Sequence, residues 1–378
     1  MSDPPLGLYI HWPYCARICP YCDFNVYRAR GNDDALFNAL LADLAYWAVA
    51  LPDRPLTSIH FGGGTPSLMS PTQIEQLIDR AQSSFGFANN IEIGLEANPN
   101  DSDRFDGFFE AGINRLSLGV QSFRDDALKA LGRDHDGVAS RQALDAALNV
   151  FTNVSIDLIY AREDQTEAGW AAELSDALKT GLSHLSLYQL TIEAGTAFAK
   201  RVERGELKPP GDELGERLYR QTQALCQEAG LPGYEVSNHA KPGLESRHNK
   251  IYWEGADWIG IGPGAHGRIG SHLGGGRLAT ATALRPADYI RRTLETGTGS
   301  KPETLSALDE ARERILMGLR ISDGLDLDQL TRATGLTVNS VELARYIAQG
   351  WLAQTGSHLC FTDDGLLLAD GIAAALCP

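Results

Sequence analysis

Three cysteines near the start of the chain, Cys15, Cys19 and Cys22, constrain its structure more than any other feature. They follow a C-x₃-C-x₂-C spacing in a loop directly after the apolar run at residues 6–10. Three thiolates this close together can ligate three irons of a [4Fe–4S] cluster and leave the fourth iron open to a small molecule. The alternatives are a zinc site completed by His11 and a redox-active thiol pair. Structural zinc sites usually draw ligand pairs from two separated knuckles, and no second Cys/His pair follows in this sequence, so the cluster is favoured.

The first half of the chain alternates between strand-like and helix-like segments. Apolar runs predict six strands at residues 6–10, 56–61, 91–97, 115–120, 154–159 and 184–190. Helical patterns lie between them at 33–50, from 70 onwards, at 103–112, 140–148 and 167–178. Ser70, Pro71 and Gln73 form a favourable helix start, with a capping serine and a proline in the first turn. Six such repeats predict an α/β fold whose parallel sheet curls into a full or partial barrel.

Polar and glycine-rich positions fall at the carboxyl ends of the predicted strands, where such sheets carry their chemistry. They are Gly62–Thr65, Glu96, Gln121 and Asp157, and the cysteines follow the first strand. Position alone therefore predicts one shared pocket. The glycine stretch lacks the G-K-[ST] residues that end a phosphate-binding P-loop. If it does not bind a ligand, it would simply be a tight turn that needs a positive φ. A buried carboxylate at Glu96 would need a partner, such as a cationic or hydroxylated ligand. The alternative to ligand binding is that Glu96 caps the next helix.

Composition excludes several classes of protein. The 378 residues are 43% apolar and 22% charged, as in soluble globular proteins. The sequence has no run of 18 apolar residues and no basic and apolar leader, so neither a membrane span nor a signal peptide is expected. Six cysteines, three of them crowded together, predict a reducing cytoplasm rather than a disulfide framework. A formal net charge of −16 argues against a nucleic-acid partner.

The cysteine triplet at the head of an alternating strand–helix chain resembles the signature of radical S-adenosylmethionine (SAM) enzymes. The stretch Leu8-Tyr9-Ile10-His11-Trp12-Pro13-Tyr14-Cys15 narrows the resemblance to the coproporphyrinogen dehydrogenase-like, or HemN-like, branch. The resemblance implies a partial (β/α)₆ barrel, an electron donor, and a [4Fe–4S] cluster whose open iron binds SAM for cleavage to a deoxyadenosyl radical. Carried over position by position, it implies SAM contacts at Tyr9, Tyr21, Gly63, Gly64, Thr65, Glu96, Gln121, Arg133 and Asp157.

Two departures from the branch stand out. Residues 161–164 read Ala-Arg-Glu-Asp where family members usually have Gly-Leu-Pro before a Gln-Thr pair, which leaves the geometry of this loop open. Phe24 stands where coproporphyrinogen dehydrogenases carry a fourth cysteine. As part of the same departure, the chain begins almost at its first strand, and it is therefore expected to lack the N-terminal extension that those enzymes use over the porphyrinogen.

A second motif lies beyond the predicted barrel. The string H-N-x-x-Y-W, formed by His248, Asn249, Tyr252 and Trp253, resembles the marker of HemW-type proteins, the haem chaperones of this branch. A histidine can ligate haem iron and aromatic rings can stack on a porphyrin, whereas ordinary core packing is the plain alternative. The resemblance implies haem binding through these four residues. His266, in the glycine-rich stretch 260–267, is a weaker second candidate for the ligand.

A second unit begins near residue 301. Helical patterns at 305–319, 327–334 and 338–348, then a strand pair in 351–369 turning at 363–365, predict a small winged-helix-like α+β domain. Residues 305–378 hold ten acidic and five basic side chains, a net charge of −5, which disfavours the DNA-reading role of such folds. The resemblance implies instead the C-terminal domain of this family. We therefore expect a barrel at 1–235, a haem-motif segment at 236–300 and this domain at 301–378.

The resemblance as a whole implies a cytoplasmic haem chaperone without dehydrogenase activity. It is expected to bind haem, the cluster and SAM, and to deliver haem to acceptors such as membrane-associated respiratory enzymes. The cluster and SAM are expected to control its state or its homodimerisation. The alternatives are an oxygen-independent coproporphyrinogen III dehydrogenase, which Phe24 disfavours, and a HemN-like radical SAM methyltransferase that uses a second SAM.

Overall fold

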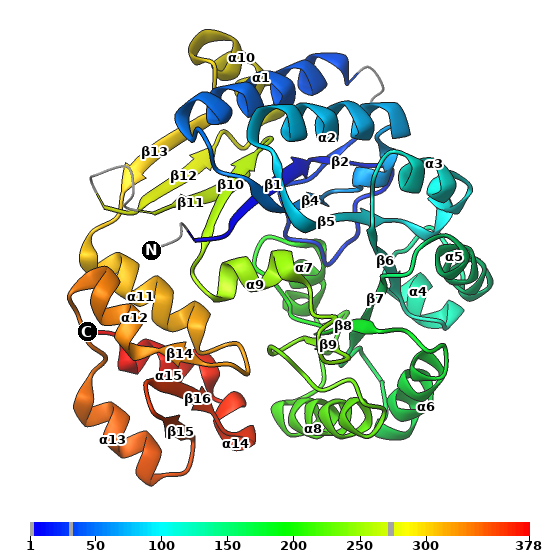
Figure 1. Ribbon diagram of the computed structural model, residues 1–378. Coiled ribbons are helices and arrows are strands. Elements are labelled where there is room, and N and C mark those ends of the chain that lie inside the picture. The colour runs from blue at the N-terminus through cyan, green and yellow to red at the C-terminus, as the bar shows by residue number, and fades with distance from the viewer. Residues whose placement is uncertain (1–3, 30–32, 271–275) are drawn as a thin grey trace.

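The computed structural model describes residues 4–29, 33–270 and 276–378. Figure 1 shows a long curved sheet with most helices on its outer, convex side and a separate small domain that holds the C-terminus. In the described ranges, no helix is both long and apolar enough to cross a membrane.

Six parallel strands of the sheet are the strands predicted from the apolar runs. They are β1 (Leu6–Trp12), β4 (Leu56–Gly63), β5 (Phe87–Ala97), β6 (Arg115–Gln121), β7 (Val154–Tyr160) and β8 (His184–Gln189). Each pairs in parallel with the next in this order, which confirms the predicted α/β class and the partial six-stranded barrel. Their carboxyl ends consequently meet at one rim.

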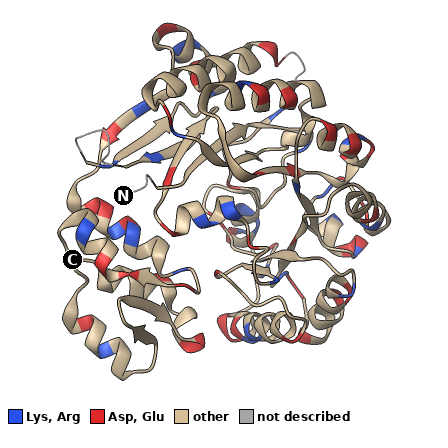
Figure 2. Cartoon of the chain, viewed as in Figure 1, with Lys and Arg blue, Asp and Glu red and all other residues tan. Residues whose placement is uncertain are grey.

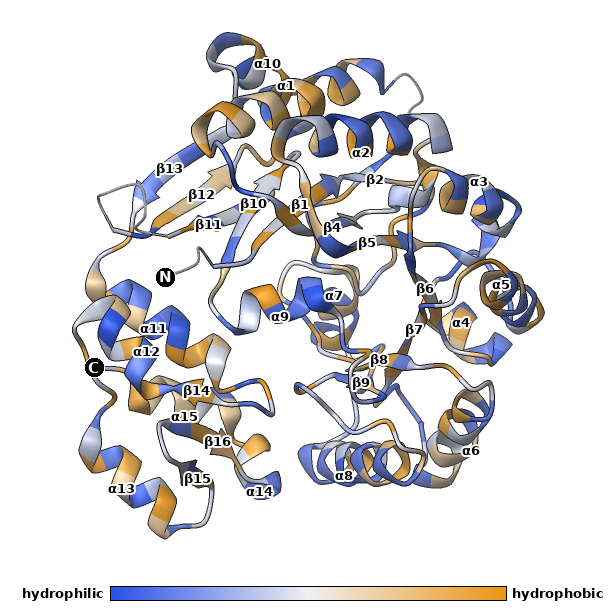
Figure 3. Ribbon diagram, in the orientation of Figure 1, coloured by the Kyte–Doolittle hydropathy of each residue, from blue (hydrophilic) through white to orange (hydrophobic). Residues whose placement is uncertain are grey.

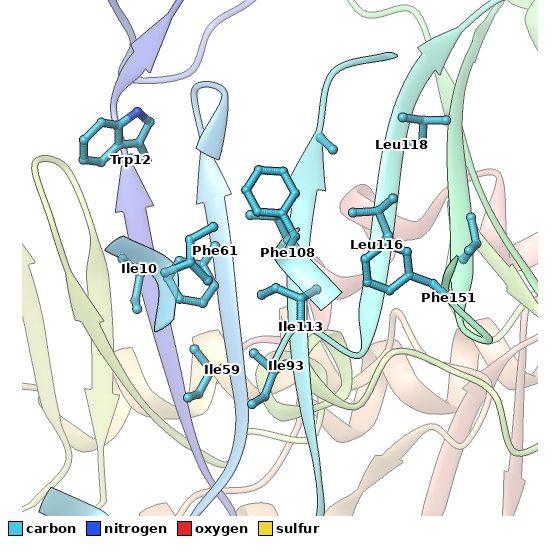
Figure 4. Packing of buried hydrophobic residues seen from close by; sticks show 14 of the residues in the cluster. Ile10, Trp12, Ile59, Phe61, Ile93, Phe108, Ile113, Leu116, Leu118 and Phe151 are labelled. Carbon is cyan, nitrogen blue, oxygen red and sulfur yellow. The ribbon is translucent and has the colours of Figure 1, made fainter. Parts of the chain in front are cut away.

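The alternation of side chains along these strands explains why the sheet curls around a polar interior. Figure 4 shows apolar side chains of neighbouring strands on one face, covered by side chains from the helical layer: Ile10, Trp12, Ile59, Phe61, Ile93, Leu116 and Leu118, with Phe108, Ile113 and Phe151. The intervening positions, such as Ser58 and His60 on β4 and Ser117 on β6, face the interior. One face thus packs on helices while the other carries polar groups.

The helices that cover the sheet include the five that were predicted: α1 (Asp34–Ala50), α2 (Pro71–Phe85), α3 (Phe105–Glu110), α5 (Gly137–Val150) and α6 (Glu167–Leu178). Three more were not predicted: α4 (Asp125–Ala130), α7 (Ala197–Glu203) and α8 (Asp212–Glu228). Ser70 and Gln73 form the predicted capping box at the start of α2. The helix predicted at 103–112 is divided between a 3₁₀ turn at Pro99–Arg104 and α3. Figure 3 shows polar residues on the outward side of α2 and α8.

The sheet extends beyond the six predicted strands at both ends. Strand β10 (Asp257–Ile261) lies parallel to β1, and β11 (His266–Ile269), β12 (Leu278–Thr282) and β13 (Ser300–Thr304) continue in antiparallel order. Strand β9 (Asn238–Ala240) is antiparallel to β8. The stretch 273–282 is rich in small residues, which is typical of a loop or a weak strand; it contains β12, and residues 273–275 lie outside the described residues. Helix α10 (Pro286–Thr296) packs on α1.

Helix α9 (Arg247–Trp253) differs from the other helices because it lies on the inner side of the curved sheet (Figure 1). It contacts β1, β4 and β10. The buried carboxylate of Glu92 on β5 accepts hydrogen bonds from the backbone N–H groups of Arg247, at 3.2 Å, and His248, at 3.0 Å. A carboxylate at a helix N-terminus is favourable, so Glu92 holds α9 inside the barrel.

The C-terminal domain has its own hydrophobic core, which includes Ile315, Leu330 and Leu359. Its elements are α11 (Ala307–Gly318), β14 (Leu325–Asp326), α12 (Leu327–Thr334), α13 (Ser340–Ala348), β15 (Leu352–Thr355), β16 (His358–Phe361), α14 (Asp363–Leu366) and α15 (Ala369–Leu376). The three predicted helices are present. Figure 2 shows basic and acidic residues mixed along α11. The domain boundaries proposed at residues 235 and 300 stay predictions.

The strand turn predicted at 363–365 is wrong. The strands β15 and β16 turn instead between Thr355 and His358, where Gly356 adopts a positive φ of 61°. Residues 363–366 form α14, because the hydroxyl of Thr362 accepts a hydrogen bond from the Gly365 N–H and caps a helix.

Candidate functional site

A cavity of about 350 Å³ opens at the carboxyl ends of the parallel strands. It is lined by every residue predicted to bind the cluster or SAM except Tyr9: Cys15, Cys19, Tyr21, Cys22, Gly63, Gly64, Thr65, Glu96, Gln121, Arg133 and Asp157. Tyr9 points into the barrel below the cavity, where its hydroxyl lies 2.9 Å from Nδ1 of His11. The grouping expected from strand position is therefore present, whereas the individual roles stay predictions.

The cysteine loop leaves three unpaired thiols facing this cavity. It runs between two short strands, β2 (Tyr14–Cys15) and β3 (Tyr27–Arg28), and Cys15, Cys19 and Cys22 are all free. Burial raises the pKa of the Cys22 thiol to about 11, and it also raises the pKa of Cys15. Without a metal these two thiols hold their protons, and iron would take the place of those protons.

The donor set fits a cluster better than a single metal ion. Among the described residues, no three cysteine, histidine or carboxylate side chains converge as the ligands of one ion must. The histidine that could have completed a zinc site, His11, has both ring nitrogens engaged, Nδ1 by Tyr9 and Nε2 by the Asn25 carbonyl at 3.0 Å. In a [4Fe–4S] cluster each thiolate binds a different iron, so three thiols around one cavity suffice.

The glycine-rich loop after β4 is packed tightly against the cysteine loop. The N–H of Gly64 donates to the Trp12 carbonyl at 2.7 Å, and that of Thr65 to the Tyr14 carbonyl at 2.9 Å. The N–H of Gly63 donates to Glu96 at 3.3 Å, and Gly63 has a positive φ of 109°. With all three N–H groups used, the loop cannot cradle a phosphate. The positive φ at Gly63 accounts for the tight turn, and the loop still lines the cavity.

Two carboxylates face the cavity from β5 and β7, the two strands that flank β6. Glu96 accepts from Gly63 and lies 3.1 Å from Nε2 of His60, while Asp157 accepts from the Ser117 hydroxyl at 3.1 Å. Burial, and then the charge of Glu96, raise the pKa of Asp157 to about 6. The capping alternative for Glu96 does not hold, because Asn98 caps the following turn. The pair therefore suits a ligand with a positive charge or hydroxyl groups.

Gln121 and Arg133 complete the rim of the cavity. Gln121 ends β6 with a positive φ of 65°, which is rare for a residue with a side chain and marks local strain. The guanidinium of Arg133 donates from Nη1 to Sγ of Cys19 at 3.3 Å and from Nη2 to the Gly119 carbonyl at 3.0 Å. Its Nε is buried without a partner.

The loop at 161–164, whose geometry the sequence left open, contains two left-handed residues, Ala161 and Asp164, each with a φ of 57°. Arg162 between them is buried and forms an ion pair with Glu173 of α6 at 2.5 Å. The loop borders a second cavity, also of about 350 Å³, which is separate from the residues predicted to bind SAM.

The haem motif lies at the base of the barrel rather than in the cavity. His248 is only 1% exposed, and its Nδ1 and Nε2 contact the Ser58 hydroxyl at 2.7 Å and the Tyr252 hydroxyl at 2.6 Å. Asn249 reaches toward Tyr234 at 3.4 Å, and Trp253 lies under Arg320 of the C-terminal domain. Both ring nitrogens of His248 are therefore taken in this arrangement, and haem ligation by His248 stays a prediction. The weaker candidate, His266, is exposed.

Sequence reasoning missed several residues of the interior. Ser117 and Tyr188 line the cavity beside the predicted set, and His60 is a partner of Glu96. The available signal was the alternation along the strands, since Ser117 pairs in register with Glu96.

An open parallel barrel with a thiol triplet, a glycine turn and carboxylates at one rim is the arrangement of a radical SAM protein. The model of the radical SAM superfamily matches residues 9–174, and that of the HemN C-terminal domain matches residues 305–368. The chain is 35% identical to the haem chaperone HemW of Mycobacterium tuberculosis, over 100% of this chain and 96% of that one. It is also 35% identical to HemW of Escherichia coli, over 98% and 97%. The chain therefore belongs to the HemW family of radical SAM proteins.

Two further proteins complete the comparison. A mitochondrial radical SAM domain-containing protein 1 of Danio rerio is 38% identical over 84% of this chain and 73% of that one. The solved structure of coproporphyrinogen III oxidase (HemN) from Escherichia coli superposes with a TM-score of 0.83 at 23% identity, over 99% of this chain and 90% of that one. This likeness shows the fold.

Proposed function

We propose that this protein is a haem chaperone that binds a [4Fe–4S] cluster and SAM in the rim cavity and delivers haem to haem-dependent acceptors. The observation that carries the proposal is the 35% identity, over essentially the full length of both chains, to proteins named haem chaperones. Fold alone does not decide between haem delivery and porphyrinogen oxidation. Phe24 in place of a fourth cysteine favours delivery.

The proposed cofactor site uses the residues that line the cavity. Cys15, Cys19 and Cys22 would hold the cluster, which when bound supplies an electron for cleavage of the SAM sulfonium. The half-buried Glu96 and Asp157 carboxylates, which line the cavity, suit the positive charge and the ribose hydroxyls of SAM. The unpartnered Nε of Arg133 is a donor for the SAM carboxylate.

Further residues would shape the rest of this site. Gly63, Gly64 and Thr65 leave their carbonyl side to the SAM amino group, and Gln121 and Tyr21 lie on the walls of the same cavity. Tyr9 supports the site from below through His11.

The proposed haem site is the H-N-x-x-Y-W segment in a state that differs from the one described above. In the present arrangement His248 is fully paired, which suits a haem-free, closed state. For haem to reach Nε2 of His248, the hydrogen bond between this nitrogen and the Tyr252 hydroxyl must break, and α9 must move from the base of the barrel. Lys250 of α9 forms an ion pair with Asp323 of the C-terminal domain at 2.9 Å, and Trp253 packs under Arg320. That domain therefore holds α9 in place.

The remaining parts of the proposal concern partners. A chaperone of this kind acts in the cytoplasm and hands haem to acceptors such as membrane-associated respiratory enzymes. Reduction of the cluster requires an electron donor. SAM and cluster binding would control the state of the protein, including homodimerisation.

The test is an anaerobic haem titration of the reconstituted protein, run beside a coproporphyrinogen turnover assay. His248→Ala should weaken haem binding at least tenfold, whereas the control His358→Ala, at an exposed histidine of β16, should leave it unchanged, and neither protein should turn over the porphyrinogen. Unfolding midpoints report whether the buried substitution damages the fold. Turnover to protoporphyrinogen would contradict the proposal in favour of the dehydrogenase. If the protein shows no haem binding and no porphyrinogen turnover, this result would contradict the proposal and favour the methyltransferase.

A further inference from the structure

Arg133 is held against one ligand of the cluster site by a close approach of two loops. It follows Gly132, which has a positive φ of 71° and lies against Pro20 of the cysteine loop. A Cβ on Gly132 would come within 2.6 Å of the Pro20 ring, so only glycine permits this contact. The approach places Nη1 of Arg133 at 3.3 Å from Sγ of Cys19.

The guanidinium is also fixed from its other side. Nη2 donates to the Gly119 carbonyl at 3.0 Å, at a point where β6 has no side chain to obstruct it. The titratable groups that face Arg133 are Cys19 and Tyr21 of the cysteine loop and its own neighbour Asp134. The carboxylate of Asp134 is engaged by His135 and by Asn98. The guanidinium is therefore a fixed, half-buried cation that donates to the sulfur of Cys19.

We propose that Arg133 sets the reduction potential of the cluster through its N–H···S contact with Cys19. One-electron reduction adds a negative charge to the cluster and its thiolates. A hydrogen bond to a ligating sulfur and a fixed positive charge both stabilise the reduced form, and so they raise the potential. Both side chains are half-buried, so water and salt screen this interaction less than they screen an exposed pair. Arg133 is thus a positioning and tuning residue for the cluster, independently of any contact with SAM.

The experiment is a redox titration of the reconstituted protein with dithionite and mediators, followed by electron paramagnetic resonance, without SAM or haem. It compares the wild type with Arg133→Gln, which removes the charge, and Arg133→Lys, which keeps it. Arg17→Gln is the matched control. Arg17 is an exposed arginine of the cysteine loop, and it contacts the Arg133 carbonyl at 3.5 Å. Each titration is run at low and high salt, after iron content has been measured.

In Arg133→Gln the ratio of reduced to oxidised cluster at a fixed solution potential should fall about tenfold, which corresponds to ~59 mV for a one-electron couple. The shift should persist at high salt, and Arg133→Lys should fall between this variant and the wild type. Any shift in Arg17→Gln should be smaller and should vanish at high salt.

An unchanged potential in Arg133→Gln, or an equal shift in Arg17→Gln at high salt, would overturn the proposal. If Arg133→Gln does not assemble a cluster, the lysine variant decides: a lowered potential supports the role and a wild-type potential overturns it. Failure of the wild type to assemble any cluster would contradict the cluster assignment itself, which is a separate outcome.

Discussion

His248 and Tyr252 lie one helical turn apart on α9, and Nε2 of the imidazole is 2.6 Å from the phenolic oxygen. The rings meet edge to face, with centroids 5.0 Å apart. The two side chains that were predicted to contact haem therefore satisfy each other inside the barrel. Any haem ligation by His248 has to compete with this contact.

Tyr252→Phe should consequently speed haem binding while lowering stability. The change frees Nε2 of His248 but leaves it without a partner, at a cost of about 1–3 kcal/mol in the free energy of unfolding. Stopped-flow haem association and urea unfolding measure the two effects. Tyr289→Phe is the control, because it also removes a buried hydroxyl, which donates to Asp43 at 2.8 Å, far from α9. Equal association rates in the two variants would contradict the closed-state account.

Gly64→Ala should weaken SAM binding at least tenfold. A Cβ at this position would lie 2.7 Å from the Tyr14 carbonyl oxygen and 2.9 Å from that of Trp12, so the glycine loop must move away from the cysteine loop. Equilibrium dialysis of SAM against the reconstituted protein measures the effect. Gly211→Ala is the matched control, since nothing lies within 4 Å of its Cβ. Undiminished affinity in Gly64→Ala would remove the glycine loop from the SAM site.

Asp164→Gly should stabilise the protein by up to about 1 kcal/mol. Asp164 is exposed and has a φ of 57°, a conformation that costs free energy for residues with a side chain and little for glycine. Asp164→Ala should destabilise the protein instead, because aspartate tolerates this conformation better than alanine. Urea unfolding of the wild type and the two variants gives the order of their stabilities. If Asp164→Ala were as stable as Asp164→Gly, the backbone at this position would not be strained.

Asp43→Asn should change how stability depends on pH. Asp43 of α1 is buried beside the hydroxyls of Tyr289 and Thr298, and burial raises its pKa from 3.8 to about 6 despite these hydrogen bonds. The folded state thus favours the protonated acid. The contribution of Asp43 to the free energy of unfolding is greatest below pH 4 and falls as the pH rises toward 6.

The difference in free energy of unfolding between the wild type and Asp43→Asn should therefore decrease by roughly 1–3 kcal/mol between pH 4 and pH 7. Urea unfolding at several pH values measures it. Parallel curves for the two proteins would mean that Asp43 titrates normally in the fold.

The parallel core of the fold could be predicted because its strands are short segments rich in apolar residues, each with a polar residue at or near its carboxyl end. Helical patterns separate these segments, and that alternation is typical of a parallel sheet covered by helices. The strands β10 and β11 were missed because they are short and overlap the glycine-rich stretch 260–267, and because β10 pairs with β1, which is far away in the sequence. Local sequence carries little information about a pairing at that separation.

The candidate site, like the fold, was predictable from the sequence only in part. Strand ends converge by topology, so the sequence sufficed to group Glu96 and Asp157 with the cysteines. The position of α9 could not be predicted, because it depends on the Glu92 carboxylate binding the His248 backbone across 156 positions of sequence. The H-N-x-x-Y-W motif alone does not indicate whether the imidazole of His248 faces the solvent or the core.

Haem delivery is tested most directly by stopped-flow transfer of haem from the loaded protein to an apo b-type cytochrome, under anaerobic conditions with SAM present. A chaperone hands over haem within a complex. The account therefore predicts a transfer rate that rises with acceptor concentration and exceeds the rate at which apomyoglobin removes haem from the same sample. A transfer rate equal to that removal rate at every acceptor concentration would contradict delivery, because the haem would then only dissociate and be captured.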